Sequence, residues 1–310
     1  NYDASSATSG AWIAYPGAAN DDTFTGSAFD DMFLGSQGAD YFDGGAGDYD
    51  VVSYAFETGS AGVQAYLANG HYTDTYGNTD TLIGIEIIEG SSNNDFLDAR
   101  GTSASTTFIG GEGNDTIYGG SGADVLLGGS GNDIIDGGAD MDTLMHSFAS
   151  GGVEVYLNAN KSRGADGYDT ITNIENVAGS DHNDRLIGDA GNNVLLGGLG
   201  DDILKGKGGD DTYYGDAGND TIRGDAGVDI MFGGLDSDTL LGLSGDDVLD
   251  GGEGDDYLYG GQDNDTLNGG DGADALRGNR GNDILNGEAG SDDLRGGGGN
   301  DTLDGGADND

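Results

Sequence analysis

Several residue types are rare or missing in this chain of 310 residues, which has no cysteine, one proline, one tryptophan and 10 basic against 58 acidic side chains. Without cysteine, the chain forms no disulfide and performs no thiol chemistry. Its formal net charge of -48 repels phosphates and argues against nucleic acid binding. No apolar run approaches the roughly 20 residues needed to span a membrane, and no N-terminal signal peptide is visible.

Glycine and acidic residues are abundant instead, with 65 glycines and only 35% hydrophobic residues. Such a composition is typical of disordered chains. A strict periodicity argues against disorder here. In residues 179–310 a nine-residue pattern, GGxGxDxUx with U a large apolar residue, repeats without insertion or deletion.

Three positions of this repeat are nearly invariant. Position one is Gly in all fifteen copies, and position six is Asp in fourteen of the fifteen, with Asn193 as the exception. Position eight is always large and apolar. The position-six residues before Asp310 are Asp184, Asp202, Asp211, Asp220, Asp229, Asp238, Asp247, Asp256, Asp265, Asp274, Asp283, Asp292 and Asp301.

These repeats resemble the calcium-binding nonapeptides of the RTX (repeats-in-toxin) family. The resemblance implies an all-β fold, a right-handed parallel β-roll with calcium ions between its turns. Positions one to six would form the calcium-binding turn, positions seven to nine a short strand, and two repeats one coil. It further implies type I secretion from a Gram-negative bacterium, hence a secreted, extracellular or cell-surface location.

The chemistry of the turn agrees with calcium ligation. Calcium takes roughly 6 to 8 oxygen ligands, which carboxylates and turn carbonyls can supply. Glycine allows backbone conformations that a Cβ would forbid. A solvated acidic face would not explain the fixed spacing, so we predict that the position-six aspartates bind multiple Ca²⁺ ions. Because each repeat buries only one large apolar side chain, we expect the chain to be unfolded without calcium.

Two further arrays carry the same pattern. A degenerate array in residues 17–50 places Asp22, Asp31 and Asp40 at position six, but its last unit breaks phase at Tyr49, which makes calcium ligation there doubtful. The array in residues 90–145 supplies Asp95, Asp115, Asp124, Asp133 and Asp142. Aspartate replaces glycine at position four at Asp140, Asp236, Asp263 and Asp308, either as an added ligand or as a tolerated surface variant.

The segments between the arrays are related to each other. GVQAYL (62–67) matches GVEVYL (152–157), and both alternate apolar and other residues as strands do. We therefore predict an N-terminal cap or linker (1–16), a degenerate array (17–50), a longer β coil (51–89), an array (90–145), a second longer coil (146–178) and a long β-roll (179–310).

Position nine distinguishes two outer faces of the long roll, because residues eighteen apart stack. One column has four of the ten basic residues: Ile187, Lys205, Arg223, Leu241, Tyr259, Arg277 and Arg295. The other is Leu196, Tyr214, Phe232, Asp250, Asn268, Asn286 and Asp304, with Val194, Ile230 and Val248 beside it. The apolar part is a candidate contact surface, and the basic column could meet an anionic cell-surface polysaccharide.

No catalytic constellation is evident. HExxH and GxSxG patterns are absent, the three histidines are scattered, and Glu86, Glu89 and Glu175 fit outward strand residues better than an acid and base pair.

We predict that the chain is not an enzyme but a calcium-dependent structural or adhesive module, self-assembling or contacting neighbouring domains through its faces and ends. The alternatives are the secretion and stabilising module of a type I secreted enzyme, such as an alginate epimerase, protease or lipase, and a simple calcium store. The chain begins at Asn1 and stops in mid-repeat at Asp310, so we expect either a fragment or processed form of a longer protein or ends that are covered by neighbours.

Overall fold

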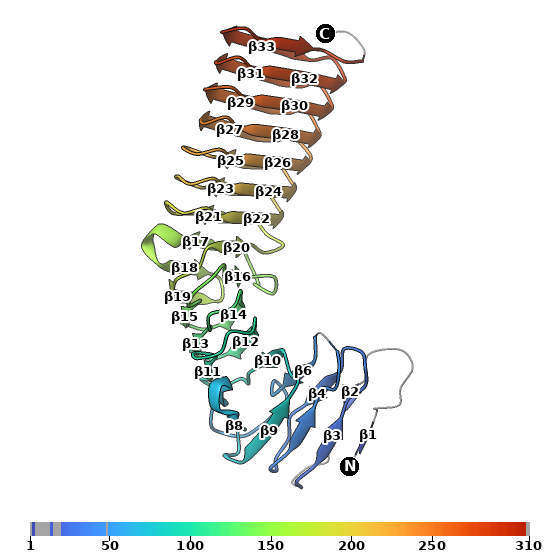
Figure 1. Cartoon of the computed structure of the whole chain (residues 1–310), viewed down its shortest axis with the longest axis vertical. Helices are drawn as coiled ribbons and strands as arrows, with labels where there is room; N and C mark the ends of the chain where they lie inside the picture. Colours follow the sequence, from blue (N-terminus) through green and yellow to red (C-terminus); the bar gives the residue numbers. More distant parts are fainter. Residues whose placement is uncertain (1, 4–12, 15–19, 48, 308–310) are drawn as a thin grey trace. The chain divides into compact units, whose positions relative to one another are not determined.

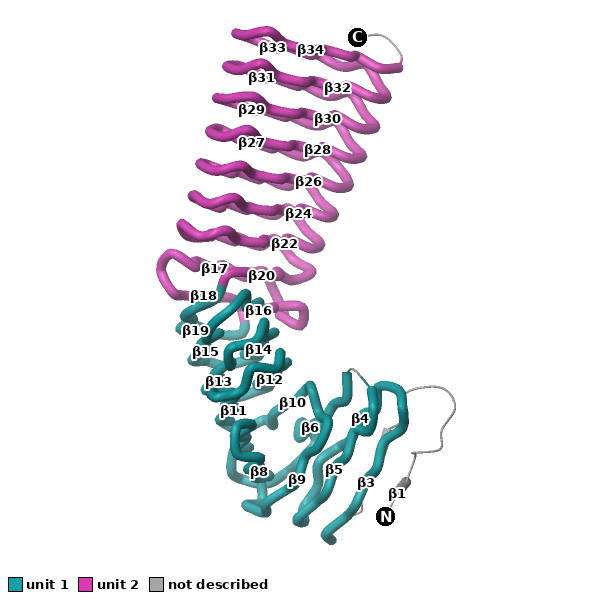
Figure 2. Tube along the Cα trace, viewed as in Figure 1, with its two compact units in different colours: residues 1–144, 166–174 teal, residues 145–165, 175–310 magenta. Residues whose placement is uncertain are grey.

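Figure 1 shows a computed structural model of the chain, which describes residues 2–3, 13–14, 20–47 and 49–307. Apart from two single-turn 3-10 helices, the regular structure in these ranges consists of short β-strands. The chain divides into two compact units (Figure 2): residues 1–144 with 166–174, and residues 145–165 with 175–310. The all-β class predicted from the repeats is confirmed.

Unit 1 contains two stacks of strands. One consists of β2 (Ile13–Ala14), β4 (Met32–Leu34), β6 (Val51–Ser53), β10 (Ile87–Glu89), β12 (Thr107–Glu112), β14 (Val125–Ser130) and the start of β16 (Thr143–Met145). The other consists of β1 (Tyr2–Asp3), β3 (Thr23–Thr25), β5 (Tyr41–Asp43), β7 (Gln64–Tyr66), β8 (His71–Thr73), β9 (Thr79–Ile83), β11 (Phe96–Asp98), β13 (Thr116–Tyr118), β15 (Ile134–Asp136) and β19 (Gly167–Thr172), with the 3-10 turn η1 (Leu67–Asn69).

Unit 2 has the same construction. One stack is β20 (Asn176–Ala178), β22 (Val194–Leu199), β24 (Thr212–Ala217), β26 (Ile230–Leu235), β28 (Val248–Glu253), β30 (Thr266–Asp271), β32 (Ile284–Ala289) and β34 (Thr302–Asp304). The other is β17 (Glu154–Tyr156), β18 (Lys161–Gly164), β21 (Arg185–Ile187), β23 (Ile203–Lys205), β25 (Thr221–Arg223), β27 (Thr239–Ser244), β29 (Tyr257–Gln262), β31 (Ala275–Arg280) and β33 (Asp293–Gly298), with η2 (Leu157–Ala159).

The register of the strands follows the repeat. Leu204 pairs with Ile222 and Leu249 with Leu267, so partners in parallel strands lie one coil, or two nonapeptides, apart. The parallel β-solenoid predicted from the sequence is therefore confirmed. Several strands are longer than positions seven to nine, because the next two or three residues also pair with the neighbouring coil, as Gly252 does with Gly270.

Each sheet contributes a single column of large side chains to the core, one from each nonapeptide. Position-eight residues from Leu186 to Leu285 are fully buried, whereas Leu303 in the last coil is 47% exposed. In unit 1 the same positions carry an aromatic stack, in which the Phe24 and Phe42 rings lie 5.3 Å apart and are nearly parallel. Because alternate strand residues point outward, each coil buries little apolar surface.

The longer coil of unit 1 differs from the parallel path expected of a solenoid. After β7 the chain turns through η1, whose C-cap Gly70 is left-handed, and returns as β8 antiparallel to β7. Strand β9 then pairs antiparallel with β8 and parallel with β5. The related segment of unit 2 forms the same hairpin, with β18 antiparallel to β17 after η2. Left-handed residues at Gly70 and Asn160 make these reversals.

Most of the predicted N-terminal cap or linker (1–16) lies outside the described residues. Within it, β1 pairs in parallel with β3 and β2 pairs in parallel with β4. Across the described ranges, no helix is long and apolar enough to cross a membrane.

Candidate metal centre

Each turn of the roll places its position-six aspartate in the interior, one above the next. The backbone N–H of Asp220 donates to Oδ1 of Asp238 (2.7 Å), and Asp238 donates in the same way to Asp256 (2.7 Å). The second column repeats this, with Asp229 donating to Asp247 (2.9 Å) and Asp247 to Asp265 (3.0 Å). One carboxylate oxygen of each residue is thus used to join successive coils.

The other oxygen, Oδ2, is buried without a hydrogen-bond partner in most regular turns. These oxygens belong to Asp50, Asp115, Asp133, Asp202, Asp220, Asp229, Asp238, Asp247, Asp256, Asp265, Asp274 and Asp283. A buried polar atom without a partner costs about 1–3 kcal/mol, and more when the group is charged. Because such an oxygen recurs at one position of successive turns, the roll presents a regular series of donors that suits a cation.

A backbone carbonyl of the next coil faces the same space. A Cβ added to Gly251 would overlap both Asp256 Oδ2 and the carbonyl oxygen of Gly269. Gly215 has the same two neighbours, Asp220 Oδ2 and the Gly233 carbonyl. The position-one glycine therefore keeps open a cradle in which a carboxylate and a carbonyl converge, and these hard oxygen donors suit Ca²⁺.

The other predicted position-six ligands include some with the same inter-coil bond and some whose carboxylates accept further hydrogen bonds. Asp142 and Asp292 are buried and accept backbone N–H bonds from Asp124 and Asp274 (2.8 and 2.9 Å). Asp301 and Asp22 are half-buried. In a further group the residue at position two donates to the carboxylate, through a serine hydroxyl, a backbone N–H or both: Asp31, Asp40, Asp95, Asp124 and Asp184.

The carboxylates do not gather into side-chain clusters. Among the described residues, no group of three or more His, Cys, Asp or Glu side chains could hold a metal ion. The structure brings position-six aspartates together only as columns, one per turn. Any ion in a turn must therefore take most of its ligands from the backbone.

Position-four aspartates are placed differently. Asp140, Asp236 and Asp263 are exposed, and their backbone φ angles are 82°, 75° and 74°. This left-handed region is one that glycine, asparagine and aspartate enter most easily. The structure therefore gives these residues a turn-forming role at the surface. Asp308 lies outside the described residues.

Three turn residues were not predicted. Asp50 is 1% exposed and its Oδ1 accepts the N–H of Asp31 (2.7 Å), which is the position-six geometry despite the break of phase at Tyr49. Asp80 and Asp169 accept the N–H groups of Asp40 and Asp133 (2.9 and 3.0 Å). All three begin an Asp-x-U triplet, Asp50 directly before β6 and the other two within β9 and β19, and this signal does not depend on the nine-residue period.

The side chains considered for other chemistry have ordinary surroundings. Glu86 accepts the backbone N–H of Asp50 (3.0 Å), and His146 contacts the Ser162 hydroxyl (3.0 Å). His71 and His182 are exposed.

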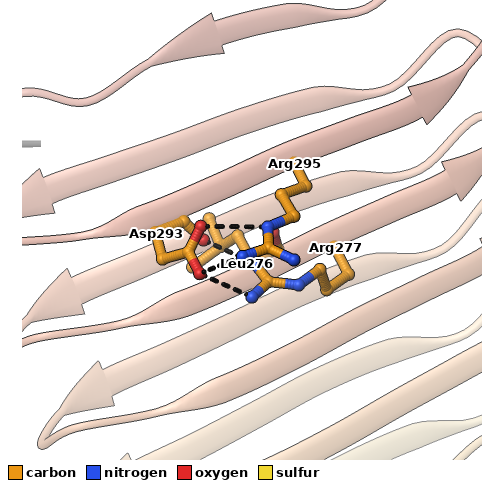
Figure 3. Close-up of polar contacts among 4 residues, drawn as sticks. All are labelled: Leu276, Arg277, Asp293 and Arg295. Atoms are coloured by element: carbon orange, nitrogen blue, oxygen red, sulfur yellow. Dashed lines mark hydrogen bonds and ion pairs between the residues drawn. The ribbon is translucent and has the colours of Figure 1, made fainter.

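The two position-nine columns exist as predicted, since Tyr214 pairs with Phe232 on one sheet and Lys205 with Arg223 on the other. Arginines of the basic column pair within the chain (Figure 3). Arg277 and Arg295 both contact Asp293, at 2.7 and 3.1 Å, and Arg277 also donates to the Leu276 carbonyl. Arg223 pairs with Asp225. These ion pairs reduce the positive potential that the column would offer an anionic polymer.

A parallel roll that stacks buried aspartates beside backbone carbonyls is a cation-binding β-solenoid, and its donors favour calcium. The model of the RTX calcium-binding nonapeptide repeat matches residues 16–51 and 109–144, and in overlapping copies 178–213, 205–240, 233–267, 241–276 and 277–310. These matches cover more than half of the chain, which belongs to this family of calcium-binding repeats. No match was found among curated proteins.

Acidity should stabilise the calcium-free roll. Burial raises the pKa of Asp115, Asp202 and Asp265 to about 8 and the pKa of Asp229 and Asp238 to about 7. The backbone hydrogen bonds to these carboxylates lower the pKa, but burial has the larger effect. In the unfolded chain these groups titrate near about 4. The folded state therefore binds more protons between about pH 4 and 8, and stability falls as pH rises through this window.

We expect the calcium-free chain to show more β signal in far-UV circular dichroism at pH 5 than at pH 8. With saturating calcium the order should reverse, since protons compete with the ion for the carboxylates. Equal spectra at both pH values without calcium would contradict this expectation.

Proposed function

We propose that calcium ions bind in the open turns, held by the position-six Oδ2 and the position-one carbonyl of the next coil. The observation that carries this proposal is the recurring pair of converging oxygens, one of them buried without a partner. A bound divalent cation would neutralise carboxylates and join successive coils. The chain itself supplies the oxygens, excludes water from them by burial, and orients each carboxylate through the inter-coil N–H bond.

Removal of a single charge tests the site. Asp247→Asn keeps an oxygen that can accept the Asp229 N–H but removes the second charged oxygen. We expect it to lower the calcium bound per chain by one ion, measured by calorimetry, and to raise the calcium concentration at half folding. Asp271→Asn is the matched control, because Asp271 is exposed at position three. If Asp247→Asn and Asp271→Asn changed the calcium bound per chain equally, calcium binding would depend on the overall charge of the chain and not on the position-six carboxylate.

We propose further that this calcium-folded segment is a structural or adhesive part of a protein secreted by the type I route. Membership in the RTX repeat family supports export from a Gram-negative bacterium in unfolded form, followed by folding where calcium is plentiful. The engagement of Glu86 in a turn supports a structural, non-catalytic role. The alternative is that the same roll serves as the secretion and stabilising module of an attached enzyme.

An apolar face on unit 2 favours assembly. This face, defined as Val194, Leu196, Tyr214, Ile230, Phe232 and Val248, includes the rings of Tyr214 and Phe232, stacked with centroids 5.1 Å apart and each residue 37% exposed. Ile230 and Val248 beside them are 39% and 37% exposed. Contiguous exposed apolar surface of this kind often marks a contact site.

We expect the chain to form ordered assemblies in millimolar calcium that a chelator dissolves, observed by light scattering and electron microscopy. Phe232→Asp should abolish them, whereas Tyr259→Asp, at position nine of the opposite sheet, should not. A stable monomer at all concentrations would contradict assembly and favour the enzyme-module alternative.

A further inference from the structure

Two consecutive turns in one column of unit 2 depart from the open geometry. In the first, Asn193 stands at position six, and its side-chain amide donates to the carbonyl oxygen of Glu175 in the preceding coil (2.8 Å). Its Oδ1 accepts the backbone N–H of Asp189 (3.0 Å), so both ends of the amide are satisfied. A neutral amide that is hydrogen-bonded at both ends offers a cation no charge, and its single oxygen already accepts a hydrogen bond.

The second turn contains a carboxylate, but a hydroxyl fills its cradle. Tyr213 is fully buried at position eight, and its Oη lies 3.1 Å from Asp211 Oδ2 and 3.5 Å from the Gly224 carbonyl oxygen. A Cβ added to Gly206, the position-one glycine of this turn, would overlap both Asp211 Oδ2 and the tyrosine hydroxyl.

The regular turn of the other column shows what the hydroxyl replaces. Around Gly197, the space that a Cβ would take is bounded by Asp202 Oδ2 and the Gly215 carbonyl. These atoms are equivalent to Asp211 Oδ2 and the Gly224 carbonyl, since each carbonyl follows its aspartate by thirteen residues. Asp202 Oδ2 has no hydrogen-bond partner, whereas Asp211 Oδ2 accepts the hydroxyl proton. The Tyr213 hydroxyl thus stands between the two oxygens that a regular turn offers to an ion.

Unit 1 contains a related contact, made by a tyrosine at a different place in its coil. The hydroxyl of Tyr54, a residue that is 1% exposed, donates to Asp80 Oδ2 (2.9 Å), while Asp80 Oδ1 accepts the inter-coil N–H of Asp40. Asp80 lies outside the predicted arrays, so the contact between a tyrosine hydroxyl and a buried carboxylate also occurs independently of the nonapeptide pattern. In both units a buried tyrosine hydroxyl satisfies the carboxylate oxygen that is left open in regular turns.

We propose that the Asn193 and Asp211 turns bind no calcium and are closed by proton donors of the chain itself, the Asp189 backbone N–H and the Tyr213 hydroxyl. This inference rests on the proposed calcium sites of the open turns. Its consequence is a gap in the calcium column that starts at Asn193, whereas the column through Asp202 and Asp220 is continuous. The coils at β22 and β24 then require fewer ions than the coils that follow them.

The test is a crystal structure of the full chain grown with calcium, with anomalous data to locate the ions. We expect a peak between Asp202 Oδ2 and the Gly215 carbonyl, and none between Asp211 Oδ2 and the Gly224 carbonyl. A peak at Asp211 would overturn the inference while leaving the calcium sites intact. Absence of a peak at Asp202 as well would overturn the proposed function itself, so the two failures are distinguishable.

Tyr213→Phe provides the second arm, because it removes the hydroxyl and keeps the ring that fills the core. We expect it to bind one more calcium ion per chain by native mass spectrometry, and Tyr214→Phe, at the exposed neighbouring position, to bind the wild-type number. Loss of one ion in Tyr213→Phe would show that the hydroxyl is itself a ligand, and an unchanged number would show that it does not exclude the ion. Either result would overturn the inference.

If Tyr213→Phe does not fold, Asn193→Asp tests the preceding turn in the same way. We expect this variant also to gain one ion, because it restores a carboxylate beside Gly188 and the Gly206 carbonyl. An unchanged ion count in Asn193→Asp would overturn the inference for that turn.

Discussion

Chelation of calcium should convert the chain from a β-rich fold to a coil, with loss of the far-UV β signal and expansion of the hydrodynamic radius. The position-eight side chain is the main apolar contribution of each nonapeptide to the core, and this is too little to offset the entropy of ordering a glycine-rich chain. The net charge of -48 opposes compaction, and the buried carboxylates would be ionised at neutral pH in the unfolded state. A ligand that binds only the folded chain reverses this balance.

The measurement is circular dichroism with size-exclusion chromatography, first in excess EDTA and then after calcium is restored. We expect full recovery with calcium and none with an equal concentration of magnesium, which prefers a small octahedral site and keeps its water. A compact, β-rich chain in EDTA at pH 8 would refute both the calcium dependence and the assignment of the buried Oδ2 atoms as calcium ligands.

Replacing a single position-four glycine should destabilise the roll by at least about 2 kcal/mol, even when calcium is saturating. In Gly272→Ala the new Cβ would overlap the carbonyl oxygen of Gly254 in the preceding coil, at a backbone φ of 153° that L-residues rarely adopt. Coils above and below are hydrogen-bonded in fixed register, so the backbone cannot move aside locally.

Asp263→Gly is the matched control for this change. Asp263 occupies position four with φ near 74° and an exposed side chain, so its replacement should alter stability little. Urea unfolding in saturating calcium should show a large fall in midpoint for Gly272→Ala alone. Similar midpoints for both variants would mean that position four tolerates a side chain throughout the roll.

The strict arrays were predictable because the period of nine specifies both which residue faces inward and which residues stack. The buried columns of Asp220 and Asp247 and the two position-nine faces follow directly from that spacing. Asp50 was missed because one extra residue at Tyr49 moves it out of phase, although the coil absorbs the insertion. Repeat spacing cannot foresee a bulge of this kind, since it is decided by the neighbouring coil.

Side-chain interactions between coils were also beyond the repeat pattern. Tyr213 was predicted only as a core residue. Position eight indicates that the ring is buried, but it does not indicate which group the hydroxyl contacts. Arg277 was predicted to face solvent as part of a basic column, yet Asp293 lies beside it from position seven of the next coil. These contacts depend on rotamers of long side chains, which periodicity does not determine.

The antiparallel excursion in unit 1 changes the geometry of the coils around it. Between β5 and β11 one sheet contains three strands, β9, β8 and β7, whereas between β6 and β12 the opposite sheet contains only β10. At about 4.8 Å per strand, one side of the solenoid is longer than the other by roughly 10 Å. The excursion is therefore a wedge of two extra strands in one sheet of unit 1. A single irregular coil can in this way change the spacing between regular coils in one sheet and leave the opposite sheet unchanged.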